Sequence, residues 1–401
     1  VSSHEYSITM KKITIIGRGT AGCLAATHFL RWTDWEIDWV FDPNINPQAV
    51  GEGSDLALPA LLTENIDFKY TDLLKINGTI KMGVNKTNWG KFGKDFMHVF
   101  GNSAMHAMHF NALELQNFII NYMGKQPRVK IIHKNVTHDS IDSDYIFDCS
   151  GAPKDYTDYT ISDYIPVNAA YVTQCNWDHA RFTHTEAIAR PHGWVFGIPL
   201  TNRCAIGYLY NTNISSLDEV KKDVPGILEG LNLVPDRTSH LQFKNYYRNK
   251  NFDKRVGYGG NASFFLEPLE ATSIACMDIV QRLAIDIWVG HKEVERANND
   301  YTLHFEKIET FLMMHYYAGS KFDTPFWDFA INRGKNKIKS IHNASFKDDF
   351  INSLRMIKLS DSINLKALKA THFSVWPIKP SIKDHIDNLG IFDKICKEFN
   401  I

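Results

Sequence analysis

A glycine-rich turn near the N-terminus constrains this chain more than any other feature. Residues 12–16 are apolar and β-branched and predict a strand, and Gly17-Arg18-Gly19-Thr20-Ala21-Gly22 follows them directly. Apolar residues at helical spacing from Leu24 to Leu30 then predict a helix. In this strand–turn–helix context, glycines allow the tight turn and let the backbone approach a pyrophosphate at the helix N-terminus.

A second predicted strand, residues 36–41, ends at Asp42. An acid about twenty residues beyond such glycines can bind a ribose hydroxyl. Turn, helix and acid together therefore predict a dinucleotide site. The pattern does not distinguish NAD from FAD, and a glycine-rich turn without a nucleotide is the structural alternative.

The second informative stretch is Phe264–Ile274, which reads F-F-L-E-P-L-E-A-T-S-I. An apolar run precedes Pro268, and the small residues Ala271, Thr272 and Ser273 then open an amphipathic helix. A helix start carries unpaired N–H groups and can hold an anion, and Glu270 beside it can act as an acceptor or base. From the residue types alone, a structural helix in which Glu270 complements the dipole is the simpler interpretation.

The composition indicates a globular protein with a sizeable core. Hydrophobic residues make up 44% and charged residues 22% of 401 residues, and the formal net charge of -1 gives no argument for nucleic acid or an anionic membrane. The six cysteines are scattered without a CxxC pair, so we predict reduced thiols and no metal site. The first ten residues do not read as a signal peptide, and no apolar run is long enough for a bilayer. We expect one continuous cytoplasmic fold.

Glu267–Ile274 resembles E-P-L-E-[SA]-T-[GS]-I, the hallmark of flavin-dependent halogenases of the tryptophan halogenase type. Other stretches agree in order along the chain. Residues 50–53, V-G-E-G, are similar to the family's flavin-wrapping G-V-G-E-A, and residues 96–101, F-M-H-V-F-G, to F-Y-H-S-F-G. Residues 193–199, G-W-V-F-G-I-P, resemble W-x-W-x-I-P with Phe196 as the second aromatic, and residues 323–327, D-T-P-F-W, are a family marker. The resemblance runs from about residue 11 to 327.

The resemblance implies an α/β, FAD-binding Rossmann-like fold of the glutathione-reductase and p-hydroxybenzoate-hydroxylase type. We expect a core over residues 11–330, with an interleaved substrate-side sheet at about 160–260, and a helical C-terminal segment over 331–401. Among the remaining elements, we expect a helix over 108–123. The implied cofactor-binding residues are Gly17, Arg18, Gly19, Thr20, Ala21, Gly22, Asp42, Glu52, Asn261 and Ile274. The implied halide-binding residues are Thr272 and Ser273, and the implied substrate-binding residues are His98, Phe100, Trp194 and Phe196.

The catalytic lysine of the family lies in the motif K-x-x-[IV]-K-F-x-N-W, which residues 81–89, K-M-G-V-N-K-T-N-W, resemble. Counting back from Trp89 places the lysine position at Asn85, with Lys86 next to it. In a regular strand Lys86 would point to the opposite face from position 85. We therefore expect a one-residue bulge that turns Lys86 into the pocket, and we assign Lys86 and Glu270 as catalytic.

The implied function is a halogenase. Reduced FAD from a separate flavin reductase, O2 and bromide, iodide or chloride would make hypohalous acid. This would halogenate small electron-rich aromatic or heteroaromatic substrates beyond Trp194 and Phe196. The early chain end and the short stretch after Gly101 suggest an open pocket and a substrate other than free tryptophan. The alternatives are an FAD-dependent aromatic hydroxylase and, because of Asn85, a flavin-binding protein without activity. The oligomeric state is left open, with a homo-oligomer allowed.

Overall fold

The computed structural model describes residues 10–45, 51–100, 106–359, 386 and 388–401, and it confirms the parallel sheet expected around the glycine-rich turn. The sheet has five parallel strands in the order β17 (Val256–Tyr258), β9 (Tyr145–Asp148), β1 (Lys12–Ile16), β2 (Glu36–Phe41) and β8 (Val129–His133). Because the strands are parallel, their carboxyl ends meet at one edge. Gly17 follows β1 and Asp42 follows β2 at this edge, which is where nucleotides bind in such sheets.

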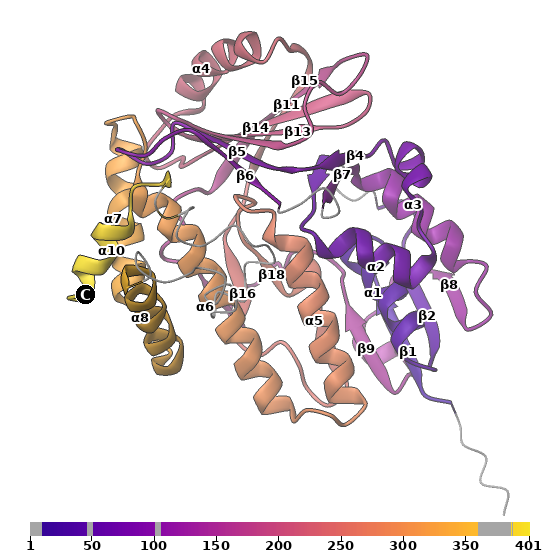
Figure 1. Cartoon of the computed structure of the whole chain (residues 1–401). Coiled ribbons are helices and arrows are strands. Elements are labelled where there is room, and N and C mark those ends of the chain that lie inside the picture. The colour runs from indigo at the N-terminus through magenta and orange to yellow at the C-terminus, as the bar shows by residue number, and fades with distance from the viewer. Residues whose placement is uncertain (1–9, 46–50, 101–105, 360–385, 387) are drawn as a thin grey trace, which may run out of the picture.

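Helices pack on this sheet around the glycine-rich turn. α1 (Thr20–Trp32) follows the glycine-rich turn and is buried from Thr20 to Phe29. It packs against α5 (Thr272–Trp288) and α3 (Ala112–Met123), with α2 (Ala57–Ile66) beside it (Figure 1). The ring of Phe29 joins these layers, with its centroid 5.4 Å from that of Phe147 on β9 and 5.8 Å from that of Trp288 on α5.

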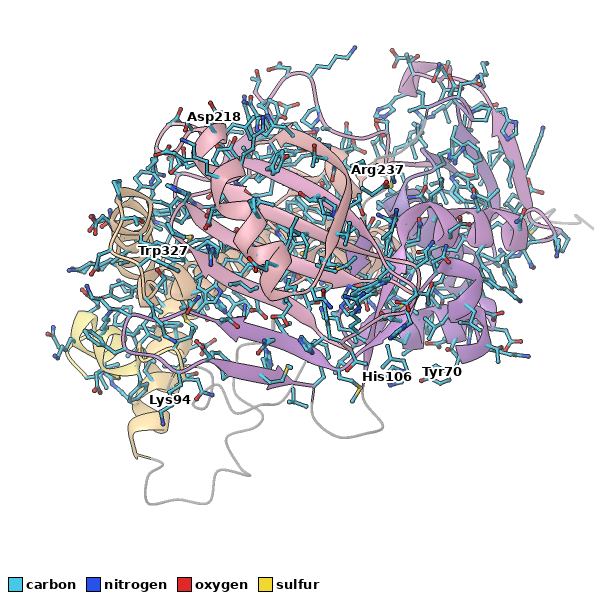
Figure 2. The ribbon with its side chains drawn as sticks, turned by 90° about the horizontal axis from the view of Figure 1, so that it is seen from above. Tyr70, Lys94, His106, Asp218, Arg237 and Trp327 are labelled. Atoms are coloured by element: carbon cyan, nitrogen blue, oxygen red, sulfur yellow. The ribbon has the colours of Figure 1, made fainter. Side chains whose placement is uncertain are left out.

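The second large sheet has seven strands. Their order is β15 (Val234–Gln242), β11 (Ala169–Asn176), β14 (Arg203–Tyr210), β13 (Gly193–Pro199), β12 (Thr185–Arg190), β5 (Gly83–Thr87) and β6 (Phe96–Val99). Figure 2 looks down on α4 (Leu217–Gly230), where Asp218 is labelled, and on the sheet below it. Val195 packs with α4 residues on this outer face, whereas the neighbouring Trp194 belongs to the main core. Strand alternation therefore points Trp194 toward the interior of the molecule.

Short elements connect the two sheets. One three-stranded sheet contains β10 (Tyr159–Ile161), β16 (Tyr246–Arg248) and β18 (Phe264–Phe265), and another contains β3 (Gly51–Gly53), β7 (Ala107–Asn111) and β4 (Thr79–Lys81). The 3-10 turns are η1 (Tyr70–Ile76), η2 (His138–Ser140) and η3 (Gly260–Ala262).

The later part of the chain is helical where the structure describes it. It contains α6 (Val294–Ala318), α7 (Pro325–Lys339), α8 (Ala344–Leu359) and α10 (Phe392–Glu398). Among the described residues, no helix has the length and apolar character needed to cross a membrane. The expectations for Val50, for residues 101–105 and for residues 360–385 and 387 lie outside the described residues.

The predicted helix over residues 108–123 is wrong in its first part. Residues 107–111 form β7, which pairs with β3 and β4, and α3 begins only at Ala112. The side chain of Asn111 accepts hydrogen bonds from the backbone N–H groups of Leu113 and Glu114. This N-cap starts the helix, and the pairing with two strands outweighs the helical spacing of the apolar residues before it.

Candidate active site

The three glycines of the turn have different surroundings. Gly17 has a φ of +100°, and a Cβ there would lie 2.3 Å from the carbonyl oxygen of Cys149. A Cβ on Gly22 would lie 2.2 Å from the carbonyl oxygen of Gly17. A Cβ on Gly19, in contrast, would meet nothing within 4 Å. Two glycines are therefore required by packing, while Gly19 keeps open the space in front of the α1 N-terminus that a pyrophosphate would use.

Other predicted cofactor residues lie around this turn. Thr20 on α1 donates a hydrogen bond to Glu52 Oε1 at 3.2 Å, which places β3 against the helix start. Burial raises the pKa of Glu52 to about 7, and the bond from Thr20 opposes that rise. A Cβ on Gly260 would lie 2.5 Å from the Cβ of Ala21, so η3 also lies against α1. The next residue in η3, Asn261, is exposed.

Of the remaining predicted cofactor residues, Arg18 and Asp42 are partly exposed and Ile274 is buried. Arg18 Nη1 donates to the carbonyl oxygen of Pro43 at 3.3 Å, and its buried Nε has no hydrogen-bond partner among the described residues. Asp42 accepts from the backbone N–H of Asn44 at 2.8 Å. Ile274 is buried in the first turn of α5.

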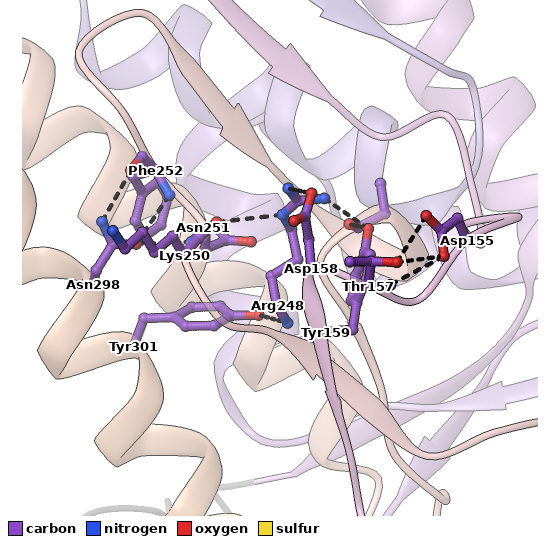
Figure 3. Close-up of polar contacts among 11 residues, drawn as sticks. Asp155, Thr157, Asp158, Tyr159, Arg248, Lys250, Asn251, Phe252, Asn298 and Tyr301 are labelled. Atoms are coloured by element: carbon purple, nitrogen blue, oxygen red, sulfur yellow. Dashed lines mark hydrogen bonds and ion pairs between the residues drawn. The ribbon is translucent and has the colours of Figure 1, made fainter.

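A polar cluster around Arg248 fixes η3 (Figure 3). Arg248 Nη1 donates to the hydroxyl of Tyr159 at 2.9 Å, and that hydroxyl donates to the carbonyl oxygen of Ala262 in η3 at 2.7 Å. The hydroxyl of Tyr301 on α6 donates to the carbonyl oxygen of Ser263 at 3.1 Å. The segment that carries Asn261 is thus bound to both β10 and α6, which holds it rigidly beside the glycine-rich turn.

A buried ion pair forms the centre of the site. Lys86 on β5 has no exposed surface, and its Nζ contacts Glu270 Oε1. His315 Nε2 on α6 lies 3.2 Å from the same Glu270 oxygen, and His98 Nδ1 on β6 lies 3.9 Å from Oε2. Burial favours the neutral acid, but the charge of Lys86 and the hydrogen bond from His315 outweigh it and hold the pKa of Glu270 well below its usual range.

The structure corrects the expected bulge before Trp89. β5 pairs with β6 residue by residue from Gly83 to Lys86, and with β12 from Val84 to Thr87. In this regular strand Lys86 faces the interior, while Asn85 faces the other side and donates to Glu186 Oε2 at 2.9 Å. Counting back from Trp89 therefore gave the wrong face, because the position of an inward residue depends on the neighbouring strands and not on the distance to Trp89.

The predicted substrate residues line the same interior. Trp194 and Phe196 lie on one face of β13 with ring centroids 6.3 Å apart. His98 and Phe100 are buried, with ring centroids 5.8 Å apart. The Nζ of Lys86 lies 5.5 Å from the centroid of Trp89. The ion pair is thus bounded by flat aromatic surfaces.

The start of α5 has the features of an anion site. Ala271, the N-cap residue, has a φ of +53°, which is unusual for a residue with a side chain, and it provides no side-chain cap. Thr272 is buried and Ser273 partly buried in the first turn. The first N–H groups of α5 therefore lack a capping side chain next to Glu270, and the two predicted halide residues lie at this helix end.

Sequence reasoning gave no role at this site to Glu267, His315 or Tyr316, and it held Lys81 only as the alternative to Lys86. Lys81 is buried, its Nζ donates to the carbonyl oxygen of Ser54 at 2.9 Å, and burial lowers its pKa to about 8. Glu267 accepts hydrogen bonds from Trp194 and Tyr316. The place of Glu267 in E-P-L-E was an available signal, whereas nothing in the local pattern marks His315 as a neighbour of Glu270.

Comparisons with known proteins identify the family. The family model for tryptophan halogenase matches residues 12–126 and 121–346. The tryptophan 7-halogenase RebH of Lentzea aerocolonigenes is 24% identical over 423 residues, covering 79% of this chain and 78% of RebH. The tryptophan 6-halogenase ThaL of Streptomyces albogriseolus is 26% identical over 257 residues, which span 55% of this chain and only 48% of ThaL.

Solved structures show the same fold. A tryptophan halogenase from Shewanella frigidimarina superposes with a TM-score of 0.70 at 17% identity, covering 98% of this chain and 94% of that one. The flavin-dependent halogenase Xcc4156 from Xanthomonas campestris gives a TM-score of 0.71 at 17% identity, with coverages of 98% and 95%. Because the family model matches most of its length, this chain belongs to the tryptophan halogenase family.

Proposed function

We propose that this chain is an FAD-dependent halogenase that uses reduced flavin, O2 and a halide to halogenate small electron-rich aromatic compounds. The observation that carries the proposal is the buried Lys86–Glu270 pair among aromatic walls, beside an uncapped helix start. A lysine and an ionised carboxylate in one buried space are the groups needed to hold an electrophile and accept a proton.

The residues around the turn fit FAD. Gly19 leaves open space at the α1 N-terminus, and Arg18 has a buried Nε that a phosphate or ribose oxygen could satisfy. Glu52, Asn261 and Asp42 would hold the rest of the cofactor. When bound, reduced FAD and O2 supply the oxidising equivalents that convert halide into hypohalous acid.

The chemistry at the ion pair follows from its charges. A halide would rest at the α5 N-terminus near Thr272 and Ser273, where N–H groups favour an anion. Lys86 would hold the oxygen of hypohalous acid, HOX, so that the halogen faces the substrate ring. The ring carbon bonds to X, the O–X bond breaks, and the ring proton passes to Glu270. The electron pair of the O–X bond stays on oxygen, and the resulting hydroxide takes a proton from the Lys86 ammonium and leaves as water. Protonated Glu270 then returns a proton to Lys86, so the balance is ArH + HOX → ArX + H2O.

The low pKa of Glu270 suits this role. The carboxylate is ionised at neutral pH and is therefore able to accept the proton of the ring intermediate. Its ion pair with Lys86 also keeps the ammonium aimed into the space next to Trp89. The aromatic walls formed by His98, Phe100, Trp194 and Phe196 favour stacking of a flat ring over binding of charged groups.

An aromatic hydroxylase is the less favoured candidate. Such an enzyme brings its substrate into contact with the flavin, and the resemblance assigns Trp194 and Phe196 the opposite task of separating the two. The sequence also contains no second nucleotide motif for NAD(P)H, which supports an external flavin reductase as the source of reduced FAD.

Turnover with a flavin reductase, FAD and bromide tests the proposal, with products identified by mass spectrometry across phenols, anilines and indoles. We expect ring-brominated products from the wild type. Glu270→Gln should still consume O2 but lose the brominated product, and Lys86→Met should lose it as well. Asn85→Ala is the matched control, because its side chain faces away, and it should keep the wild-type yield. Hydroxylated products, or full bromination by Lys86→Met, would contradict the proposal.

A further inference from the structure

One buried carboxylate has no part in the chemistry described above. Glu267, the first acid of the E-P-L-E run, has no exposed surface. Its Oε2 accepts a hydrogen bond from the indole Nε1 of Trp194 at 3.0 Å and another from the hydroxyl of Tyr316 at 2.6 Å. One oxygen thus connects β13 with the last turns of α6.

The backbone of Glu267 is anchored independently of these two donors. Its N–H donates to Asn245 Oδ1 at 2.9 Å, and Asn245 Nδ2 donates to the carbonyl oxygen of Val167 at 2.8 Å. Pro268 follows directly and restricts the backbone of Glu267 to extended conformations. The carboxylate is therefore a fixed acceptor against which Trp194 is positioned, and not a flexible side chain that follows the indole.

The indole of Trp194 forms part of the wall next to the ion pair. Its ring centroid lies 6.2 Å from that of Trp89, and the ring centroid of Tyr316 lies 5.8 Å from that of Trp89. Lys86 Nζ lies 5.5 Å from the same Trp89 ring. A rotation of Trp194 would therefore open the packing beside Lys86. A buried indole N–H without an acceptor is unfavourable, so the bond to Glu267 selects one rotamer.

We propose that Glu267 is a positioning residue that holds the Trp194 ring against Trp89, in the aromatic wall next to the Lys86–Glu270 pair. This rests on the proposed halogenase function. With the ring fixed, Trp89 and the Lys86 side chain beside it keep one arrangement, in which hypohalous acid is held for the substrate. With the ring free, that arrangement loosens, the oxidant is lost to solvent, and halide oxidation becomes uncoupled from halogenation of the substrate.

The second carboxyl oxygen is consistent with this role. Glu267 Oε1 is buried and has no hydrogen-bond partner among the described residues, while Oε2 takes both donors. Burial raises the pKa of Glu267 to about 7, against the two hydrogen bonds and the charge of Lys86. A proton on Oε1 leaves Oε2 free to accept, so both protonation states keep the Trp194 ring in place.

The positioning itself can be tested on the protein without cofactor. In 15N-tryptophan-labelled protein, the indole N–H resonance of Trp194 is assigned by its loss in Trp194→Phe. We expect its hydrogen exchange to accelerate at least about tenfold in Glu267→Leu, which removes the acceptor, and to stay slow in Glu267→Gln, whose amide oxygen replaces Oε2. Glu306→Gln is the matched control, because it changes a buried carboxyl on α6 about 15 Å along the helix from Tyr316. Unchanged hydrogen exchange of the Trp194 indole N–H in Glu267→Leu overturns the proposal.

The catalytic consequence is measured as the ratio of halogenated product to O2 consumed, with a flavin reductase and bromide. We expect Glu267→Leu to lower this ratio about tenfold with O2 consumption retained, Tyr316→Phe to lower it less, and Glu267→Gln to restore it. A parallel fall of product and O2 consumption at constant ratio shows a merely structural role and overturns the proposal. If Glu267→Leu does not fold, Tyr316→Phe decides by the same ratio. If the wild type makes no halogenated product, the proposed function fails, while the indole exchange still tests Glu267.

Discussion

Replacing Lys86 by methionine should strongly destabilise the folded chain. Methionine fills similar space but leaves the Glu270 carboxylate buried without its cation. Removing one partner of a buried ion pair costs about 3–5 kcal/mol, because an uncompensated charge remains in a poorly solvated place. The neighbouring His315 and His98 offset part of this cost, so we expect a loss of about 3 kcal/mol in the free energy of unfolding.

Combining Lys86→Met with Glu270→Leu should cost far less than the sum of the single changes. Both charges are then gone, and pairs replaced by apolar residues are often close to neutral. The resulting coupling energy should be about 2–4 kcal/mol by a double-mutant cycle. Asn85→Met is the matched control, since it loses only a half-buried hydrogen bond to Glu186, and should cost about 1 kcal/mol.

Urea unfolding followed by tryptophan fluorescence measures these differences at pH 7. The pH dependence has a definite sign, because the pKa of Glu270 is lowered on folding. The ion-pair contribution should be complete above the unfolded pKa of about 4.5 and decline as the pH falls toward the lower folded value. Additive single changes, or an Asn85→Met variant as unstable as Lys86→Met, would refute the inward placement of Lys86.

Three further predictions follow from particular contacts. Gly19→Val should abolish FAD binding, measured by flavin fluorescence, because the valine fills the space that a pyrophosphate would use. Its melting temperature should change little, since the Cβ meets no protein atom within 4 Å. Gly22→Val should instead fail to fold, since its Cβ would overlap the carbonyl oxygen of Gly17. As the pH rises from 4.5 to 7, the wild type should lose up to about 3 kcal/mol of unfolding free energy relative to Glu267→Gln. The reason is that the wild-type carboxyl keeps its proton to about pH 7 when folded but loses it near pH 4.5 when unfolded, whereas glutamine does not titrate. Equal dependence of the unfolding free energy on pH in the two proteins would count against this. Substrate conversion should follow ring reactivity and ease of halide oxidation, with electron-rich arenes and bromide or iodide preferred, because aromatic side chains bound the ion pair. Selective conversion of free tryptophan at one unactivated carbon would contradict this prediction.

Local sequence patterns were sufficient to predict the parallel sheet and the glycine-rich turn in the nucleotide-binding half of the molecule. The strand over residues 12–16, the glycine-rich turn and the following helix are adjacent in sequence, and each is determined by interactions within a few residues. The steric need for Gly17 and Gly22 belongs to the same short segment and to the strand beside it. A motif with this context therefore predicts both the fold and the edge of the sheet where a nucleotide would bind.

The catalytic half depended on contacts between distant segments. Lys86, Glu270 and His315 come from β5, the start of α5 and α6, and no local rule places them together. The period of two in β5 predicts that Asn85 and Lys86 face opposite sides, but only pairing with β6 and β12 decides which side is inside. The same holds for Glu267, whose proposed role depends on the hydrogen bonds that Trp194 and Tyr316 donate to one of its carboxyl oxygens. The sequence by itself determined which residues were available for chemistry. The tertiary structure decided which of them share one buried space, because burial and charge pairing are properties of the packed chain.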